Sequence, residues 1–184
     1  RNGFGPDDTT RQRAINYLRG DASQELRNGG TLRNRPTTPL GDIIHSSPVF
    51  VADNNTVFVG SNGGFLHAFN ASTGVERFAF APSGLLQHMG QLASPAYARR
   101  YFVDGEIAVS QRASTTNSRN ILVGMLGRGG RGLYALDVTD PAAFGNAGAG
   151  VLWENYGDAD NDMGFLLGRP VIAKVRGRNN NDPP

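Results

Sequence analysis

The sequence contains no cysteine, a single lysine, a single tryptophan and no long apolar run. Without cysteine, the chain can form neither disulfide bonds nor thiolate metal sites, and its redox compartment stays undetermined. No apolar run approaches the ~20 residues that a membrane-spanning helix needs. The chain opens at Arg1 and closes with 179–184 (NNNDPP), so we expect it to be a piece of a longer protein, in which a signal peptide cannot be sought.

A strong excess of one charge is also missing. Lys and Arg number 18 against 16 Asp and Glu, which gives a net charge of +2. Residues 1–40 carry seven arginines against four acids, net +3, whereas residues 41–184 carry net −1. Nucleic-acid-binding surfaces show a larger, clustered basic excess with aromatic residues interleaved. We therefore predict no nucleic-acid partner.

What the sequence does contain is a repeat. Residues 57–70 (VFVGSNGGFLHAFN) recur in looser form at 121–137 (ILVGMLGRGGRGLYALD). The copies align with Gly60 at Gly124 and with Ala68 at Ala135, leaving three extra residues in the second glycine turn. An apolar segment precedes each copy, and a third one at 169–173 predicts the start of a further strand, so the period is roughly 60 residues. A repeated strand, glycine turn and strand is typical of stacked all-β units.

Each unit divides into four predicted strands. They are 48–52, 56–60, 65–69 and 75–80 in the first unit, and 106–111, 120–124, 132–137 and 150–154 in the second. The breaks contain Gly, Asn, Asp and Ser, which tolerate positive φ or hydrogen-bond their own backbone. Inner strands that are apolar without alternation indicate that both faces of a sheet are covered. We therefore predict an all-β fold that is part of a β-propeller with four-stranded antiparallel blades; residues 41–184 supply about two and a half, fewer than a ring needs.

Residues 1–40 differ in kind. A capping residue within 8–10, apolar Ala14, Ile15 and Leu18, and a terminal Gly20 predict one short N-terminal helix. About ten apolar residues cannot bury a core of their own. We therefore assign 1–40 to a lead-in helix and loop that packs on the propeller of 41–184.

Several sequence blocks follow one another in a specific order. These are 17–21 (YLRGD), 40–49 (LGDIIHSSPV), 59–60 (VG), 66–69 (LHAF), 100–105 (RYFVDG), 122–124 (LVG), 129–141 (GGRGLYALDVTDP) and 152–154 (LWE). In sequence and spacing they resemble the C-terminal region of the PilC/PilY family of type IV pilus tip-associated proteins. The resemblance covers residues 14 to 175, and it departs from the family pattern at His45, where Asn is expected, and in the loops 113–119 and 179–184.

The resemblance implies a modified β-propeller of the quinoprotein-dehydrogenase-like class, located extracellularly at the pilus tip or outer-membrane surface of a Gram-negative bacterium. It also implies a non-catalytic adhesin or assembly factor that supports pilus biogenesis, twitching motility and surface adhesion. The implied partners are minor pilins, a host or abiotic surface and the rest of the protein's own propeller. The residues by themselves indicate only a rigid scaffold with long polar loops, which is a usual platform for binding surfaces.

Members of the family are also associated with a calcium loop of the form Asp-x-Asp-x-Asn-x-x-x-Asp. Here that pattern makes Asp158, Asp160 and Asp162 the metal candidates, since carboxylates on alternate residues suit a hard cation. An EF-type loop, however, needs glycine at its sixth position and a bidentate acid at its twelfth, which are Met163 and Arg169 in this chain. We favour a solvated acidic turn and expect any calcium of the full-length protein to be bound outside this chain.

No catalytic set is evident, and we predict neither catalytic nor cofactor-binding residues. His67 lies within a predicted strand, where an interior imidazole with satisfied hydrogen bonds is the favoured interpretation. His45 and His88 lie in predicted loops, and no Gly-x-Ser-x-Gly nucleophile elbow occurs. The glycine-rich run 127–132 lacks the following helix that a phosphate loop requires, and so predicts a wide hairpin turn. Its Arg128 and Arg131 could bind carboxylates of an adjacent blade.

Two alternatives stay open. Residues 66–76 (LHAFNASTGVE) also resemble the Ala-x-Asp-x-x-Thr-Gly repeats of quinone-cofactor (PQQ-type) dehydrogenase propellers. Such enzymes usually have paired cysteines and several docking tryptophans, whereas this chain has no cysteine and only Trp153. The other alternative is a β-propeller assembly scaffold of another system.

Overall fold

A computed structural model describes residues 3–36, 38–115, 117–146, 150–157 and 162–175. Its strands form two four-stranded antiparallel meanders, in which strands adjacent in sequence are adjacent in the sheet. The first sheet contains β1 Val49–Val51, β2 Thr56–Gly60, β3 Leu66–Asn70 and β4 Glu76–Phe80. The second sheet contains β5 Ile107–Val109, β6 Ile121–Met125, β7 Gly132–Asp137 and β8 Val151–Tyr156.

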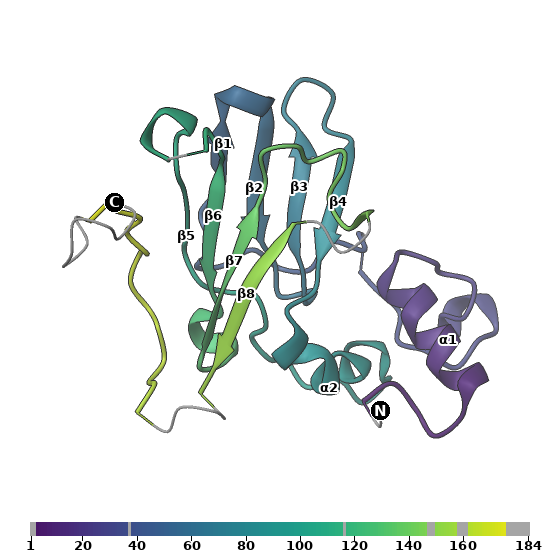
Figure 1. Ribbon diagram of the computed structural model, residues 1–184. Helices are drawn as coiled ribbons and strands as arrows, with labels where there is room; N and C mark the ends of the chain where they lie inside the picture. The colour runs from purple at the N-terminus through teal and green to yellow at the C-terminus, as the bar shows by residue number, and fades with distance from the viewer. Residues whose placement is uncertain (1–2, 37, 116, 147–149, 158–161, 176–184) are drawn as a thin grey trace.

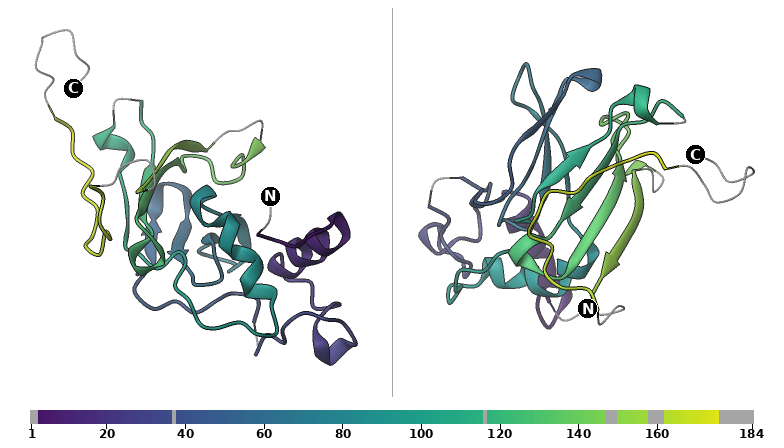
Figure 2. Two further views of the ribbon diagram at one scale, coloured as in Figure 1. Left: turned by 90° about the horizontal axis from the view of Figure 1, so that it is seen from below. Right: turned by 90° about the vertical axis from the view of Figure 1, so that its left-hand side faces the viewer.

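The helices of the described chain are few and short. They are α1 Asp8–Leu18, α2 Leu86–Met89 and the 3₁₀ turns η1 Leu26–Asn28, η2 Ala52–Asn54, η3 Ser83–Leu85, η4 Gly90–Ala93, η5 Arg112–Ser114 and η6 Gly127–Gly129. The lead-in with α1 lies on one side of the paired sheets, and residues 162–175 run along the other (Figures 1 and 2). The predicted all-β architecture is confirmed: each of the eight predicted strands is present, with its ends displaced by at most two residues.

The turns explain why the strands end where they do. After β3, the Asn70 side-chain oxygen accepts hydrogen bonds from the backbone N–H groups of Ser72 (2.9 Å) and Thr73 (3.2 Å). Gly74 then adopts φ +72°, which a residue with a Cβ rarely tolerates, and the chain reverses into β4. Between β1 and β2, the 3₁₀ turn η2 is closed by Asn55 at φ 51°, a conformation that asparagine tolerates better than most residues.

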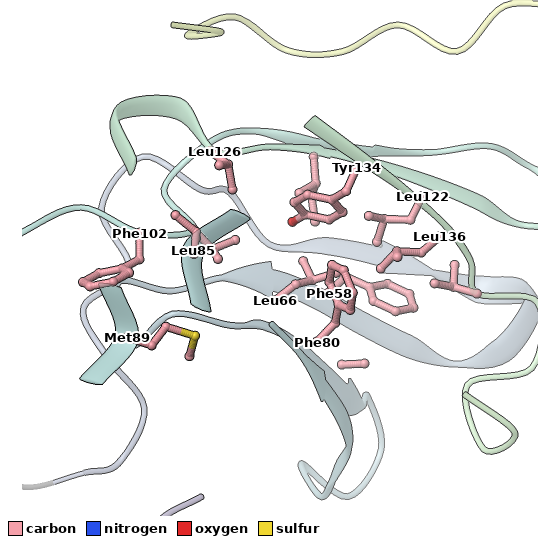
Figure 3. Packing of buried hydrophobic residues seen from close by; sticks show 14 of the residues in the cluster. Phe58, Leu66, Phe80, Leu85, Met89, Phe102, Leu122, Leu126, Tyr134 and Leu136 are labelled. Atoms are coloured by element: carbon pink, nitrogen blue, oxygen red, sulfur yellow. The ribbon is translucent and has the colours of Figure 1, made fainter. Parts of the chain in front are cut away.

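The hydrophobic core occupies the layer between the two sheets (Figure 3). Its central side chains, each at most 8% exposed, are Phe58, Leu66 and Phe80 from the first sheet and Leu122, Tyr134 and Leu136 from the second. The Phe80 and Tyr134 rings meet across the layer with their centroids 5.3 Å apart. Each such side chain contributes about 1.5–3 kcal/mol through burial, so the sheets stabilise each other. This agrees with the predicted packing of sheet faces.

The pairing of the strands corrects the alignment of the repeat by one residue. Ala68 pairs with Phe58, whereas Ala135 pairs with Val123, so Gly60 corresponds to Met125 and not to Gly124. The two positions require glycine because of different close neighbours. A Cβ on Gly60 would lie 2.6 Å from the carbonyl oxygen of Val103, and a Cβ on Gly124 would lie 2.4 Å from the Tyr134 ring.

Helix α1 begins one residue earlier than the sequence pattern indicates. Asp7 is its N-cap, and the Asp7 carboxylate accepts a hydrogen bond of 2.8 Å from the backbone N–H of Thr10. The chain leaves the helix at Gly20, whose φ is +108°. Ala14 and Tyr17 are buried against Ala93 in η4, in a small cluster beside the main core.

The prediction of a strand at 169–173 is wrong. Residues 162–175 form no helix or strand, and Val171 is 88% exposed. A strand needs a neighbour for its N–H and C=O groups, and this segment has no ladder partner among the described residues. The described part of the chain therefore contains two complete sheets and no element of a third.

Candidate functional site

At one end of the sheets, the η2 turn reaches across to the second sheet. The Asp53 carboxylate accepts hydrogen bonds from the Asn120 side-chain amide (2.9 Å) and the Arg112 backbone N–H (3.4 Å). These two bonds, the Asn120 bond foremost, hold the pKa of Asp53 below its ordinary value. The neighbouring Asn54 amide donates to the Val138 carbonyl oxygen at 2.7 Å. A groove of about 330 Å³ lies here between β1 and β5, but its lining residues Asp53, Arg112 and Asn120 are bonded to one another and hold the sheets together.

At the opposite end, two segments that lead into the sheets are paired. His45 Nδ1 lies 2.7 Å from the Asp104 carboxylate, whose side chain is fully buried and also accepts from the Asn62 amide at 3.1 Å. Two residues further along both segments, the Ser47 hydroxyl donates to Glu106 at 3.1 Å. The partners in each pair, like Asp53 and Arg112, are 59 residues apart. Equivalent residues of the repeat thus lie side by side, in agreement with the predicted period of roughly 60.

On the outer face of the first sheet, three residues form a hydrogen-bonded chain in the order of a hydrolytic triad. The Ser61 hydroxyl lies 3.0 Å from His67 Nε2, and His67 Nδ1 lies 2.6 Å from Glu76 Oε1. The imidazole is stacked against Phe69, with the ring centroids 5.7 Å apart. No local motif in the sequence marks this cluster, although the predicted pairing of strands 56–60, 65–69 and 75–80 could have placed Glu76 beside His67.

The surroundings of this cluster do not suit a nucleophile. Ser61 has no exposed surface, and its hydroxyl also accepts the Gly63 backbone N–H at 3.3 Å. An attacking hydroxyl must reach a substrate carbonyl, whereas the Ser61 hydroxyl is buried in the β2–β3 turn and already hydrogen-bonded there. His67 is only 7% exposed, as the interior-imidazole interpretation predicts. The cluster therefore connects the β2–β3 turn to β4. The other two histidines lie elsewhere: His45 belongs to the separate cluster with Asp104, and His88 lies in α2.

The glycine-rich turn is a hairpin connection. Residues 127–129 form η6, in which Gly127 has φ +59°, and strand β7 follows directly. A strand and not a helix follows the run, as the predicted wide hairpin turn requires. Within the described residues, neither Arg128 nor Arg131 forms an ion pair; Arg128 lies over the Tyr101 ring, 5.9 Å from its centroid.

The metal candidates are only partly described. Asp158 and Asp160 lie outside the described residues, and Asp162 is exposed in a turn. Met163 and Arg169, which stand where an EF-type loop needs glycine and a bidentate acid, do not fit a calcium loop. Over the described ranges, no group of three or more His, Asp or Glu side chains could hold a metal ion.

Two clefts lie between the lead-in and the first sheet. One, of about 230 Å³, is lined by Tyr17, Arg33 and Asn62 among others, and the other, of about 520 Å³, by Leu18, Phe65 and Glu76 among others. No helix in the described part of the chain is both long enough and apolar enough to cross a membrane.

Comparison with known proteins gives a consistent result. Residues 31–180 match the family described as the PilY1 β-propeller domain. The chain is 38% identical to a type IV pilus biogenesis factor PilY1 homolog of Xylella fastidiosa, over 94% of this chain and 14% of that protein. It is 34% identical to the type IV pilus biogenesis factor PilY1 of Pseudomonas aeruginosa, over 91% of this chain and 16% of that protein.

Among solved structures, the crystal structure of the Pseudomonas aeruginosa PilY1 C-terminal domain is similar, with 35% sequence identity and a TM-score of 0.47. The similarity covers 65% of this chain and 22% of that one. The chain thus spans about a seventh of the length of the curated relatives that it matches.

Proposed function

Because the chain belongs to the family of the PilY1 β-propeller domain, we propose that it is the scaffold part of a non-catalytic type IV pilus biogenesis factor. Its role is to hold binding surfaces at the pilus tip, outside the outer membrane of a Gram-negative bacterium, for minor pilins and for a host or abiotic surface. In this role the protein supports adhesion and twitching motility. Any calcium is bound outside these residues.

One observation carries the proposal that the scaffold is non-catalytic. The polar groups that could act in chemistry are already bonded to one another where they join parts of the fold: Asp53 to Asn120, His45 to Asp104, and Ser61 to His67. A nucleophile has to reach a bound substrate, whereas Ser61 has no exposed surface and His67 is only 7% exposed. His45 is exposed, but no hydroxyl is bonded to it among the described residues. The named relatives are pilus biogenesis factors, which agrees with a structural role.

The remaining blades of the same protein are the nearest proposed partners. On the second sheet, Val151, Leu152 and Trp153 of the edge strand β8 are 42–46% exposed. Apolar side chains on an edge strand favour association with further protein. We propose that the rest of the propeller covers them in the complete protein, which leaves the loops at the ends of the sheets for pilins and surfaces.

The proposal is tested in the full-length protein by removing the triad-like groups. Ser61→Ala and His67→Gln, together with His45→Gln, should leave pilus display and twitching within about twofold of the unsubstituted protein, provided that the variants fold. Phe58→Asp is the comparison, because an unpaired charge in the core should abolish display through misfolding. A hydrolytic or quinone-dependent redox activity that disappears in folded His67→Gln or Ser61→Ala would overturn the proposal.

A further inference from the structure

The smaller cleft beside α1 has an unusual charge balance. Four parts of the chain form it: α1, residues 33–36 with 38–42, the turn at Asn62 and Gly63, and the stretch from Leu92 to Tyr97. Its charged lining residues are Arg33, Arg35 and Asp42. Their partners inside the protein decide which of these charges remains available to a ligand.

Two of the three charges are balanced by ion pairs. The Arg35 side chain is buried, and its Nε donates to Glu25 at 2.7 Å. The Arg35 Nη1 donates to the backbone carbonyl of Tyr17 at 2.7 Å, so this guanidinium is occupied on two sides. Asp42 is paired with Arg99 at 2.8 Å.

Arg33 is the charge that remains. Its Nε donates to the Leu92 carbonyl oxygen at 2.9 Å, and its guanidinium lies 4.4 Å from the centroid of the Tyr97 ring. These contacts fix the side chain beside the cleft, yet no ion pair of Arg33 occurs within the described residues. The cleft therefore contains one positioned cation without a neutralising acid.

Tyr17 supplies a second feature. The residue is 2% exposed and lines the same cleft; its hydroxyl lies beside the Arg33 guanidinium, and no acceptor for its hydrogen occurs in the part of the chain that the structure describes. Burial raises the pKa of this hydroxyl, against the smaller opposite effect of Arg33 and Arg35. A buried hydroxyl without an acceptor is costly, and nearly all such groups in proteins are satisfied.

We propose that this cleft binds a carboxylate, which accepts hydrogen bonds from the Tyr17 hydroxyl and the Arg33 guanidinium. The cleft is small, about 230 Å³, so the carboxylate carries only a short apolar stem, which packs against Leu18 and Leu40. A cation would be repelled by Arg33. A phosphate dianion needs more than one free cation, and Asp42 stands in the lining. The site does not depend on the proposed pilus role, because every contact is made within this chain.

The test uses chemical modification of Arg33 in the full-length protein. Phenylglyoxal reacts with arginine side chains, and mass spectrometry follows the reaction at each site. Sodium propionate should slow the modification of Arg33 about fivefold or more, with no change at exposed Arg13 on α1. Propionamide, which has the same shape without the charge, should not protect. Equal protection by both compounds, or by neither, would overturn the proposal.

Two tyrosine variants separate binding from folding. Tyr17→Phe should reduce the protection about fivefold, while the melting temperature stays the same or rises, because the lost hydroxyl has no acceptor among the described residues. Tyr97→Phe is the matched control: it removes a hydroxyl that bonds the Arg100 backbone and keeps the ring beneath Arg33, so protection should persist. Full protection in Tyr17→Phe would show that the hydroxyl is only hydrated, against the proposal.

The source of the carboxylate follows from matched pairs of peptides. Protection by N-acetylglutamate amide but not by N-acetylglutamine amide assigns the cleft to an acidic side chain. Protection by trialanine acid but not by its amide assigns it to a chain end. If propionate alone protects, the ligand is a small free acid; each of these outcomes supports carboxylate binding.

Discussion

Ala68 of β3 and Ala135 of β7 occupy the same position in their two sheets. Each lies directly before the register shift toward the fourth strand of its sheet, between Ala68 and Phe69 and between Ala135 and Leu136. Ala68 belongs to the core between the sheets, whereas on β7 it is Tyr134 and Leu136, on either side of Ala135, that face this core. The two sheets are therefore stacked in the same orientation. The Ala68 face of the first sheet packs on the second sheet, whereas the equivalent Ala135 face of the second sheet points away from the first.

The strength of this stacking can be measured at Phe58. Phe58 has no exposed surface and lies in the core between the sheets, so Phe58→Ala should reduce the free energy of unfolding by about 3–5 kcal/mol. Phe50 on the neighbouring strand is 57% exposed, and Phe50→Ala should change the free energy of unfolding by about 0.5 kcal/mol or less. Urea unfolding of both variants decides the matter; similar losses would contradict the assignment of the core to this layer.

The sequence predicted the strands well because short-range physics determines them. Asn70 and Gly74 have side chains or backbone freedom that end a strand wherever the chain folds, and β2 is apolar because both of its faces are covered. The register of the strands was harder to predict from the sequence. Gly60 and Gly124 are alike in sequence but avoid different atoms, the Val103 carbonyl and the Tyr134 ring, which only the folded chain brings near.

The contacts of the candidate sites depend on pairing over long sequence distances. His45 meets Asp104, and Asp53 meets Asn120, across 59 and 67 residues, and no local pattern marks either pair. The uncompensated Arg33 was equally hidden, because Arg33 and Arg35 look alike in the sequence and differ only in that Arg35 meets Glu25. The strand expected at 169–173 failed for a related reason, since apolar composition cannot supply a pairing partner.

Gly124 tests the close contact within the second sheet. A Cβ at this position would lie 2.4 Å from the fully buried Tyr134 ring, so Gly124→Ala should destabilise the protein by about 1–3 kcal/mol. Gly164→Ala is the control, because nothing lies within 4 Å of a Cβ there. Adding Tyr134→Phe to Gly124→Ala should restore part of the loss, since the Tyr134 hydroxyl is one of the clashing atoms. Thermal unfolding measures all three, and an unaffected Gly124→Ala would refute the close packing.

Asp53 makes the contact between the sheets sensitive to pH. Hydrogen bonds from Asn120 and Arg112 favour the ionised carboxylate and lower the pKa of Asp53 below its ordinary value of 3.8. Ionised Asp53 therefore stabilises the fold fully above about pH 4, and this stabilisation is lost as the pH falls through the lowered pKa. Asp53→Asn lacks this contribution. We expect the difference in melting temperature between the unsubstituted protein and Asp53→Asn to shrink from pH 6 to pH 3, and a constant difference would contradict the bond to Asn120.

Trp153 tests how exposed the second sheet is when residues 1–184 are produced alone. With Val151 and Leu152 it lies on the edge strand β8, and these side chains are 42–46% exposed. Apolar edge strands associate, whereas a lysine on such a strand opposes association. We expect the polypeptide 1–184 to form oligomers or aggregates that increase with concentration, and Trp153→Lys to reduce them. Val75→Lys replaces a side chain that is 64% exposed in the β3–β4 turn and should change association little. Light scattering that shows a concentration-independent monomer, or equal association of all three proteins, would contradict the role assigned to β8.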